Sequence, residues 1–362
     1  MLETPSLLIN EEKMRRNIVK MEEICKKYGV ALRPHTKTHK ISDIAKMQIQ
    51  YGASGITVAK VSEAEVMARE GIDDIFIAYP IVTESKINRV IQLSKQINLI
   101  IGVDSLEGAV RLSELATRTK THLQVRLEVD SGFRRTGVVY NEAIRLACQI
   151  NGLEYLQLRG IYTYRGAFMN GGPTLEIEKA GIEEGKLMVA LAEKMRGEGL
   201  EVRDVSVGST PTAPFAAQVK GITEVRPGTY VFYDMMQTAL GACSLNECAA
   251  VVRVSVVSRP TEDLMIIDGG SKTFATDVPP YNTPLNLIGF GHIMEAPDAI
   301  IERFSEEHGM VKISRDAPFK VGDILHVIPN HICSTVNLHN RVYIKSGEKF
   351  EEKVVQGRGM VY

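Results

Sequence analysis

Eight short β-rich runs alternate with helical stretches over the first two thirds of the chain, and this alternation limits the fold more than any other feature. The runs recur about every 20 to 40 residues, the spacing of parallel strands joined by crossover helices. One intervening segment, residues 12–28, places Met14, Ile18, Met21 and Cys25 on one face at helical spacing. We therefore predict a (β/α)8 TIM barrel. Its strands are expected at residues 30–33, 55–59, 75–79, 99–104, 123–130, 156–162, 202–207 and 221–225.

Beyond about residue 240 the pattern changes to short strands separated by turns. Such strands are expected at residues 250–257, 264–267, 310–313, 324–328, 341–344 and 353–355. The 362-residue chain is therefore predicted to fold as an α/β protein. The barrel spans residues 8–235, and a smaller all-β C-terminal domain spans residues 240–362.

Charge and the N-terminal residues exclude several classes of protein. Lys and Arg total 43 against 44 Asp and Glu, so a net charge of −1 provides no field to attract nucleic acid or anionic lipid. The first ten residues include Glu3 and lack the layout of a signal peptide. No apolar run approaches the roughly 20 residues of a membrane helix. We expect a cytoplasmic protein without a nucleic-acid or membrane partner.

Two lysines directly follow the first predicted strand. Lys37 and Lys40 lie in the segment Arg33-Pro34-His35-Thr36-Lys37-Thr38-His39-Lys40. A barrel mouth can desolvate an amine there, which lowers its pKa and favours imine formation. A solvated basic loop is the alternative.

Three later segments also follow strand ends. The segment from Asp130 to Gly137 contains Arg134 and Arg135, one of which could point inward at an oxyanion. Small residues and hydroxyl groups occur in the other two segments, residues 208–212 (Gly-Ser-Thr-Pro-Thr) and 226–230 (Arg-Pro-Gly-Thr-Tyr). Loops after strands seven and eight form the usual phosphate site of such barrels. With a lysine able to form an imine, these segments indicate pyridoxal phosphate.

His331 and Cys333 form a His-x-Cys step in the last third of the chain. In an extended segment both side chains would share one face, and imidazole with thiolate suits zinc first among the divalent metals. With only two protein ligands, the coordination shell of the metal would stay open to water or substrate, as in catalytic metal sites. The alternative is that His331 and Cys333 are buried and bind no metal. The other four cysteines (Cys25, Cys148, Cys243 and Cys248) include no Cys-x-x-Cys and are expected to be small buried apolar residues.

These motifs resemble the D-threonine aldolase and D-serine dehydratase family of fold-type III pyridoxal phosphate enzymes, relatives of alanine racemase. The resemblance runs nearly end to end, and its most specific parts are the Pro34–Lys40 block and the late His-x-Cys. Further matches are Thr4-Pro5-Ser6 and the segments 60–65, 130–137, 208–212, 226–230 and 305–309.

The resemblance implies a role for each matching residue. Lys37 would form the imine with the cofactor, and Arg135 would lie near its 3′-oxygen. His331 and Cys333 would bind the metal, zinc or manganese. The phosphate would be held by Gly208, Ser209, Thr210, Gly228 and Tyr230.

The resemblance also implies that residues 1–7 join the β-domain and that two subunits form a homodimer. One departure is clear, since the Gly-His pair that family members often have after the sixth strand is absent from residues 162–168, which read Tyr-Thr-Tyr-Arg-Gly-Ala-Phe. Tyr164 of this segment is still expected to flank the cofactor.

These parts predict a pyridoxal phosphate- and metal-dependent lyase acting on β-hydroxy D-amino acids. The first expectation is retro-aldol cleavage of D-threonine-like substrates to glycine and an aldehyde. The close alternative is β-elimination from D-serine or 3-hydroxyaspartate, which gives a keto acid and ammonia. A racemase, a non-catalytic pyridoxal phosphate carrier and a scaffold without cofactor are weaker alternatives.

Overall fold

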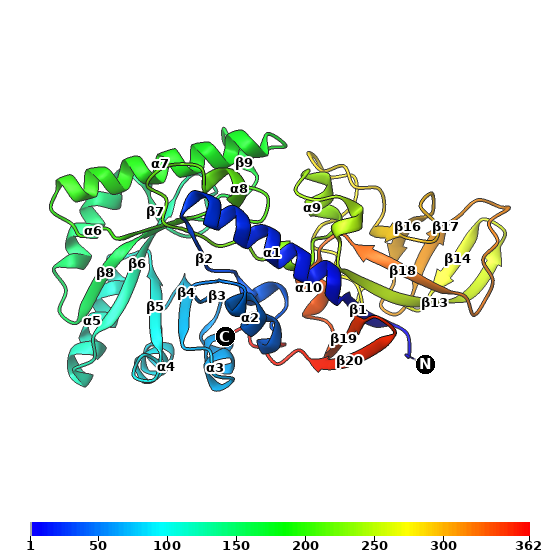
Figure 1. Ribbon diagram of the computed structural model, residues 1–362, viewed down its shortest axis with the longest axis horizontal. Coiled ribbons are helices and arrows are strands. Elements are labelled where there is room, and N and C mark those ends of the chain that lie inside the picture. The colour runs from blue at the N-terminus through cyan, green and yellow to red at the C-terminus, as the bar shows by residue number, and fades with distance from the viewer. Residues whose placement is uncertain (1) are drawn as a thin grey trace. The chain divides into compact units, whose positions relative to one another are not determined.

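The computed structural model describes residues 2–362, which form two compact units (Figure 1). The first, here the barrel unit, comprises residues 20–37, 42–228 and 359–362. The second, here the β unit, comprises residues 2–19, 38–41 and 229–358. In the described chain, no helix combines the length and the apolar character needed to cross a membrane.

All eight predicted barrel strands are present and pair in parallel. Their order around the sheet is β2-β12-β11-β8-β6-β5-β4-β3. The ring closes where the Thr57 N–H donates to the Pro34 carbonyl at 2.8 Å, beside a parallel bridge between His35 and Thr57. The bounds are β2 (Ala31–Leu32), β3 (Ile56–Val58), β4 (Asp74–Pro80), β5 (Asn98–Val103), β6 (Leu123–Asp130), β8 (Leu156–Tyr162), β11 (Asp204–Val207) and β12 (Glu224–Val225).

Amphipathic helices follow the strands, as their apolar spacing predicts. In α1 (Glu11–Tyr28) the side chains of Met14, Ile18, Met21 and Cys25 are all buried, which confirms the expected face. The helices of the barrel unit are α2 (Ser42–Gln50), α3 (Val61–Arg69), α4 (Glu84–Ser94), α5 (Leu106–Thr119), α6 (Ala143–Asn151), α7 (Ile177–Gly197) and α8 (Ala213–Ala216).

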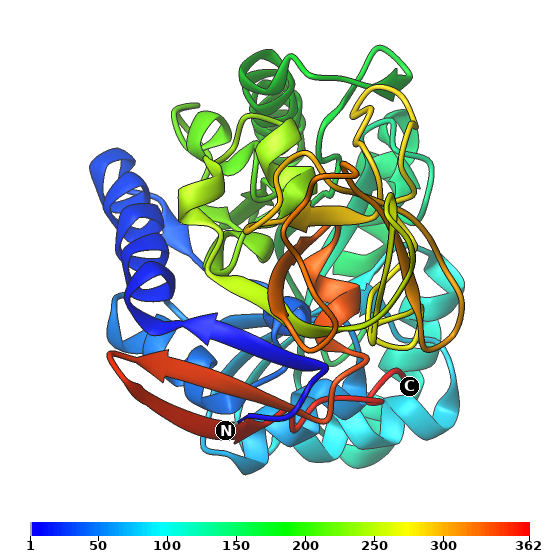
Figure 2. The same cartoon turned by 90° about the vertical axis from the view of Figure 1, so that its right-hand side faces the viewer.

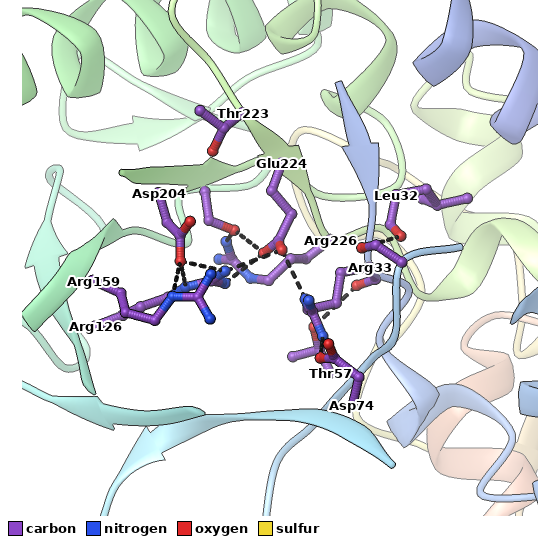
Figure 3. Close-up of polar contacts among 12 residues, drawn as sticks. Leu32, Arg33, Thr57, Asp74, Arg126, Arg159, Asp204, Thr223, Glu224 and Arg226 are labelled. Carbon is purple, nitrogen blue, oxygen red and sulfur yellow. Dashed lines mark hydrogen bonds and ion pairs between the residues drawn. The ribbon is translucent and has the colours of Figure 1, made fainter. Parts of the chain in front are cut away.

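Charged side chains fill part of the barrel interior (Figure 3). The Glu224 carboxylate accepts hydrogen bonds from Arg126 Nη1 at 2.6 Å, Arg33 Nε at 2.7 Å and Ser206 Oγ at 2.6 Å. Burial alone would raise the pKa of Glu224, but Arg126 and Arg33 outweigh it and hold that pKa well below its usual range. Asp204 adds a second carboxylate, 2.8 Å from Arg126 Nη2. Arg33 and Arg126 are therefore both paired with carboxylates.

Replacing Glu224 by glutamine should destabilise the protein by about 3–5 kcal/mol, because two buried guanidinium groups then lose their shared carboxylate. Urea denaturation measures the loss. The control is Glu201→Gln, which removes only an exposed ion pair with Arg203 and should leave the unfolding midpoint nearly unchanged. Equal losses of unfolding free energy in the two variants would contradict the stabilising role of the ion pairs around Glu224.

The β unit is mostly β-sheet, as the change of pattern after residue 240 predicts. Its strands run in the order β16-β17-β14-β13-β1-β19-β20, with β18 pairing β13 and β15. They are β13 (Ala250–Thr261), β14 (Leu264–Ile267), β15 (Gly291–Ile293), β16 (Ile300–Phe304), β17 (Gly309–Lys312), β18 (Ile324–Pro329), β19 (Arg341–Ser346) and β20 (Lys349–Val354). The short strands β15 and β16 were not anticipated.

The N-terminal strand β1 (Ser6–Asn10) belongs to this sheet. It pairs antiparallel with β13 and parallel with β19. Figure 2 shows the blue strand β1 beside the red strand β19. Leu7 and Ile9 of β1 are fully buried. The start of the chain therefore contributes to the core of the β unit.

Two of the four cysteines expected in the core are not in it. Cys25 and Cys248 are buried, but Cys148 is exposed and Cys243 is half-buried. Cys148 lies on α6, whose buried face is formed by Ala143, Leu146, Ala147 and Ile150. Helical geometry turns residue 148 away from that face.

Candidate functional site

Lys37 lies just past the end of β2, in the turn η1 (Thr36–Thr38), and its side chain is exposed. Its Nζ is 5.6 Å from the ring centroid of Tyr164, which follows β8. Its backbone N–H donates to His35 Nδ1 at 3.3 Å. The barrel unit thus brings together two predicted site residues, Lys37 and Tyr164.

Arg135 faces the same aromatic ring. Its guanidinium carbon lies 4.7 Å from the Tyr164 centroid and 5.5 Å from that of Phe133. The loop is folded by Asp130, whose Oδ1 accepts the N–H groups of Gly132 at 2.8 Å and Arg134 at 3.0 Å. Arg135, rather than Arg134, is therefore the loop arginine placed with Lys37 and Tyr164.

Lys40, the second lysine considered from sequence, is in a different environment. It belongs to the β unit and is buried, and its Nζ donates to Asn337 Oδ1 at 3.1 Å. A side chain held in this way is less available for covalent chemistry than the exposed Lys37.

The segment predicted to hold a phosphate follows β11. Gly208 has φ +83°, and a side chain there would come within 3.2 Å of Ala213 Cα, so the turn requires glycine. Ser209 and Thr210 are buried, and Thr212 Oγ1 accepts the Ser209 N–H at 2.9 Å. The result is a compact turn that carries buried hydroxyl groups.

Gly228 follows β12, which pairs in parallel with β11. The two predicted phosphate segments therefore leave neighbouring strands at the same end of the sheet. Tyr230, the last predicted phosphate residue, lies in η3 (Thr229–Val231) of the β unit and is fully buried.

Helix α7 packs closely against the turn after β11. A Cβ at Gly181 would lie 2.7 Å from the Thr212 carbonyl oxygen and 3.0 Å from Phe215 Cβ. The absence of a side chain at Gly181 thus allows the backbones to approach.

We expect Gly181→Ala to displace this turn and to weaken pyridoxal phosphate binding about tenfold, the effect of about 1.4 kcal/mol of strain. Absorbance titration of the apoprotein measures the affinity. Gly197→Ala, in the same helix, is the matched control because its Cβ would have no neighbour within 4 Å. The expectation fails if the two variants bind the cofactor equally well.

Arg165 lies in the segment after β8 where the expected Gly-His pair is absent. It is buried, its Nη2 lies 2.7 Å from Glu183 Oε1, and its backbone N–H donates to Glu184 Oε1 at 3.1 Å. Burial raises the pKa of Glu184 from 4.5 to about 7, because Arg226 and Arg165 offset only part of the desolvation. Sequence patterns did not single out Glu184, since its partners are distant along the chain.

This raised pKa predicts a pH-dependent stability. Between pH 4.5 and about 7 the folded protein keeps the Glu184 proton that the unfolded chain has lost, so stability falls as the pH rises. Relative to Glu184→Gln, the wild type should lose about 3 kcal/mol across that window. Urea denaturation at a series of pH values provides the comparison, and parallel curves for the two proteins would refute the assignment.

His331 and Cys333 meet in the β unit, although the extended conformation expected for them is wrong. A helix, α10 (Ile332–Val336), begins directly after His331, so the pair stands at a helix start rather than along a strand. Their side chains still interact electrostatically with each other. Cys333 Sγ also lies 3.2 Å from Thr38 Oγ1 and 3.3 Å from Thr229 Oγ1.

Asp277 is a partner that the sequence did not reveal. Its Oδ2 lies 2.7 Å from His331 Nδ1 and accepts a hydrogen bond from Ser334 Oγ at 2.9 Å. A carboxylate on one imidazole nitrogen orients the ring and leaves the other nitrogen to a metal or proton. Within residues 2–362, no group of three or more His, Cys, Asp and Glu side chains is arranged to hold a metal.

The pair favours a charge-separated state. Burial opposes an imidazolium, but Cys333 and Asp277 outweigh it and raise the pKa of His331 to about 11. Burial likewise opposes a thiolate, yet His331 lowers the pKa of Cys333. A thiolate is thus available as a metal ligand.

Two family models match this chain. The model of the alanine racemase N-terminal domain matches residues 9–235, and that of a serine dehydratase domain matches residues 249–345. The D-threo-3-hydroxyaspartate dehydratase of Delftia sp. (strain HT23) is 30% identical over 350 residues, which cover 92% of each chain.

Solved structures are also similar. The D-threonine aldolase from Filomicrobium marinum superposes with a TM-score of 0.88 at 26% identity, covering 100% of this chain and 97% of that one. A D-threo-3-hydroxyaspartate dehydratase with one cysteine replaced by alanine, in the metal-free form, gives a TM-score of 0.89 at 27% identity, covering 98% and 97%. The chain therefore belongs to the alanine racemase N-terminal domain family, within the group of lyases that contains these dehydratases and aldolases.

Proposed function

We propose that this protein is a pyridoxal phosphate- and divalent metal-dependent lyase acting on β-hydroxy D-amino acids, with retro-aldol cleavage of D-threonine-like substrates as its reaction. The observation that carries the proposal is that one chain brings together two groups of side chains suited to these roles. Lys37, Tyr164 and Arg135 lie together in the barrel unit, and His331, Cys333 and Asp277 lie together in the β unit.

The residues present fit pyridoxal phosphate. Lys37 offers an exposed amine beside an aromatic ring, and the turn at Gly208 offers buried hydroxyls with no room for a side chain at the glycine. Lys37 would hold the cofactor, Arg135 and Tyr164 would contact its ring, and Gly208, Ser209, Thr210, Gly228 and Tyr230 would hold its phosphate. When bound, the cofactor supplies an electron sink for negative charge at the substrate α-carbon.

The donor set at the second site fits a soft divalent ion such as zinc, with manganese as the alternative. His331 and Cys333 would bind it, and Asp277 would orient the imidazole. A metal bound there supplies a Lewis acid for the substrate β-hydroxyl. The comparisons offer support, because a relative with one cysteine replaced by alanine is described as metal-free.

Two outcomes share these residues. Retro-aldol cleavage needs a base for the β-hydroxyl proton, whereas β-elimination needs one for the α-proton, a role that the Lys37 amine could take. The thiolate ligand and the 30%-identical 3-hydroxyaspartate dehydratase favour elimination as the second candidate, with D-serine or 3-hydroxyaspartate as substrate.

Product analysis on D-threonine and D-serine with added zinc or manganese tests the proposal. Glycine and acetaldehyde identify the aldolase, and a keto acid with ammonia identifies the dehydratase. Inversion of the substrate's α-carbon alone, undiminished by a chelator, would identify a racemase and reject both lyase reactions.

The resemblance adds the expectation of a homodimer. Sedimentation equilibrium of the holoenzyme measures the oligomeric state.

A further inference from the structure

Two cysteines outside the proposed active site lie side by side in the β unit. Cys243 and Cys248 follow α9 (Met235–Ala239) and are five residues apart along the chain. Both thiols contact one hydroxyl group, since Thr238 Oγ1 lies 3.5 Å from Cys243 Sγ and 3.7 Å from Cys248 Sγ. The chain thus places two sulfur atoms around a single oxygen.

The backbone holds the two cysteines in place. The intervening turn η4 (Leu245–Glu247) is capped by Ser244, whose N–H donates to Glu247 Oε2 at 2.8 Å. Thr238 is fixed by donating its hydroxyl to the Asp234 carbonyl at 3.0 Å, and Asp234 Oδ1 caps α9 by accepting the Gln237 N–H at 2.9 Å. Little chain entropy is then lost when the sulfurs join.

The two thiols differ in exposure and in acidity. Cys243 is half-buried, whereas Cys248 is 2% exposed. The neighbouring Cys248 lowers the pKa of Cys243, whereas Cys243 together with burial raises the pKa of Cys248. Cys243 is therefore the nucleophile, and Cys248 is the resolving thiol.

We propose that Cys243 and Cys248 form a redox-active dithiol that a low-molecular-weight disulfide oxidises reversibly to an intramolecular disulfide. The Cys243 thiolate attacks one sulfur of the small disulfide, forming a mixed disulfide and releasing one small thiolate. Cys248 then loses its proton to water and its sulfur attacks Cys243, which releases the second small thiolate. The protein loses two electrons and two protons, and the small disulfide is reduced to two thiols.

The test uses the full chain carrying Cys148→Ser, which removes the exposed thiol. The protein is incubated with oxidised glutathione, quenched with acid, denatured and alkylated. We expect Cys243 and Cys248 both to lose their free thiols, and reduction with dithiothreitol to restore them. Cleavage after Glu247 should leave the peptides of Cys243 and Cys248 joined until the sample is reduced.

Two variants separate the roles of the cysteines. Cys248→Ser should accumulate the mixed disulfide on Cys243, while Cys243→Ser should leave Cys248 unmodified. The proposal would be overturned if both thiols of the intact pair stayed free after oxidation. It would also be overturned if glutathione formed a mixed disulfide equally with the remaining cysteine of each variant. The peptide mapping needs neither variant of the pair, so it stays decisive if a serine substitution prevents folding.

Discussion

Replacing Lys37 by alanine should remove the visible absorbance band of the lysine-bound cofactor and reduce turnover by at least about a thousandfold. Lys37 is the exposed amine near Tyr164, whose ring also faces Arg135. Under the proposed assignment, the variant lacks the amine that would attach the cofactor and that could act as a base. Absorbance spectra of the reconstituted protein and steady-state assays on D-threonine and D-serine measure the two effects.

Lys40→Ala is the matched control, because Lys40 lies three residues away and its amine is held by Asn337. It should reconstitute with the same absorbance band as the wild type. A Lys37→Ala protein that keeps the band, or a Lys40→Ala protein that loses it, would transfer the assignment to Lys40. A wild-type protein that stays colourless after reconstitution would defeat every pyridoxal-based hypothesis.

His331→Ala and Cys333→Ala should each keep the cofactor colour but lower metal-dependent turnover by at least about a hundredfold. Each variant leaves a single donor from the pair, and Cys333→Ala also removes the thiolate that favours a soft ion. Metal content after dialysis and turnover with added zinc or manganese provide the measurement. Chelation of the wild type should reproduce the loss.

Cys148→Ala is the control for a cysteine substitution as such, because Cys148 is exposed on α6. It should retain both metal and turnover. If His331→Ala and Cys333→Ala remain fully active, the metal assignment is wrong, although the assignment of Lys37 to the cofactor would stand.

The barrel could be read from the sequence because its signals are local. Alternating β-rich and helical segments follow from which side chains are apolar within a short window, and all eight predicted strands are present. Strands β15 and β16 were not predicted from the sequence. The His-x-Cys step shows the limit of local reasoning, since residues two apart met at a helix start rather than on a strand.

The sequence by itself determined the order of the elements, the position of Lys37 after the first barrel strand and the spacing of His331 and Cys333. These features are encoded by neighbouring residues, so periodicity and spacing reveal them. Only the tertiary structure decided which groups surround them. Asp277 orients His331 from 54 residues away, and Thr38 reaches Cys333 across 295 residues. Such partners are brought together by packing of the whole chain, which leaves no repeating pattern along the sequence.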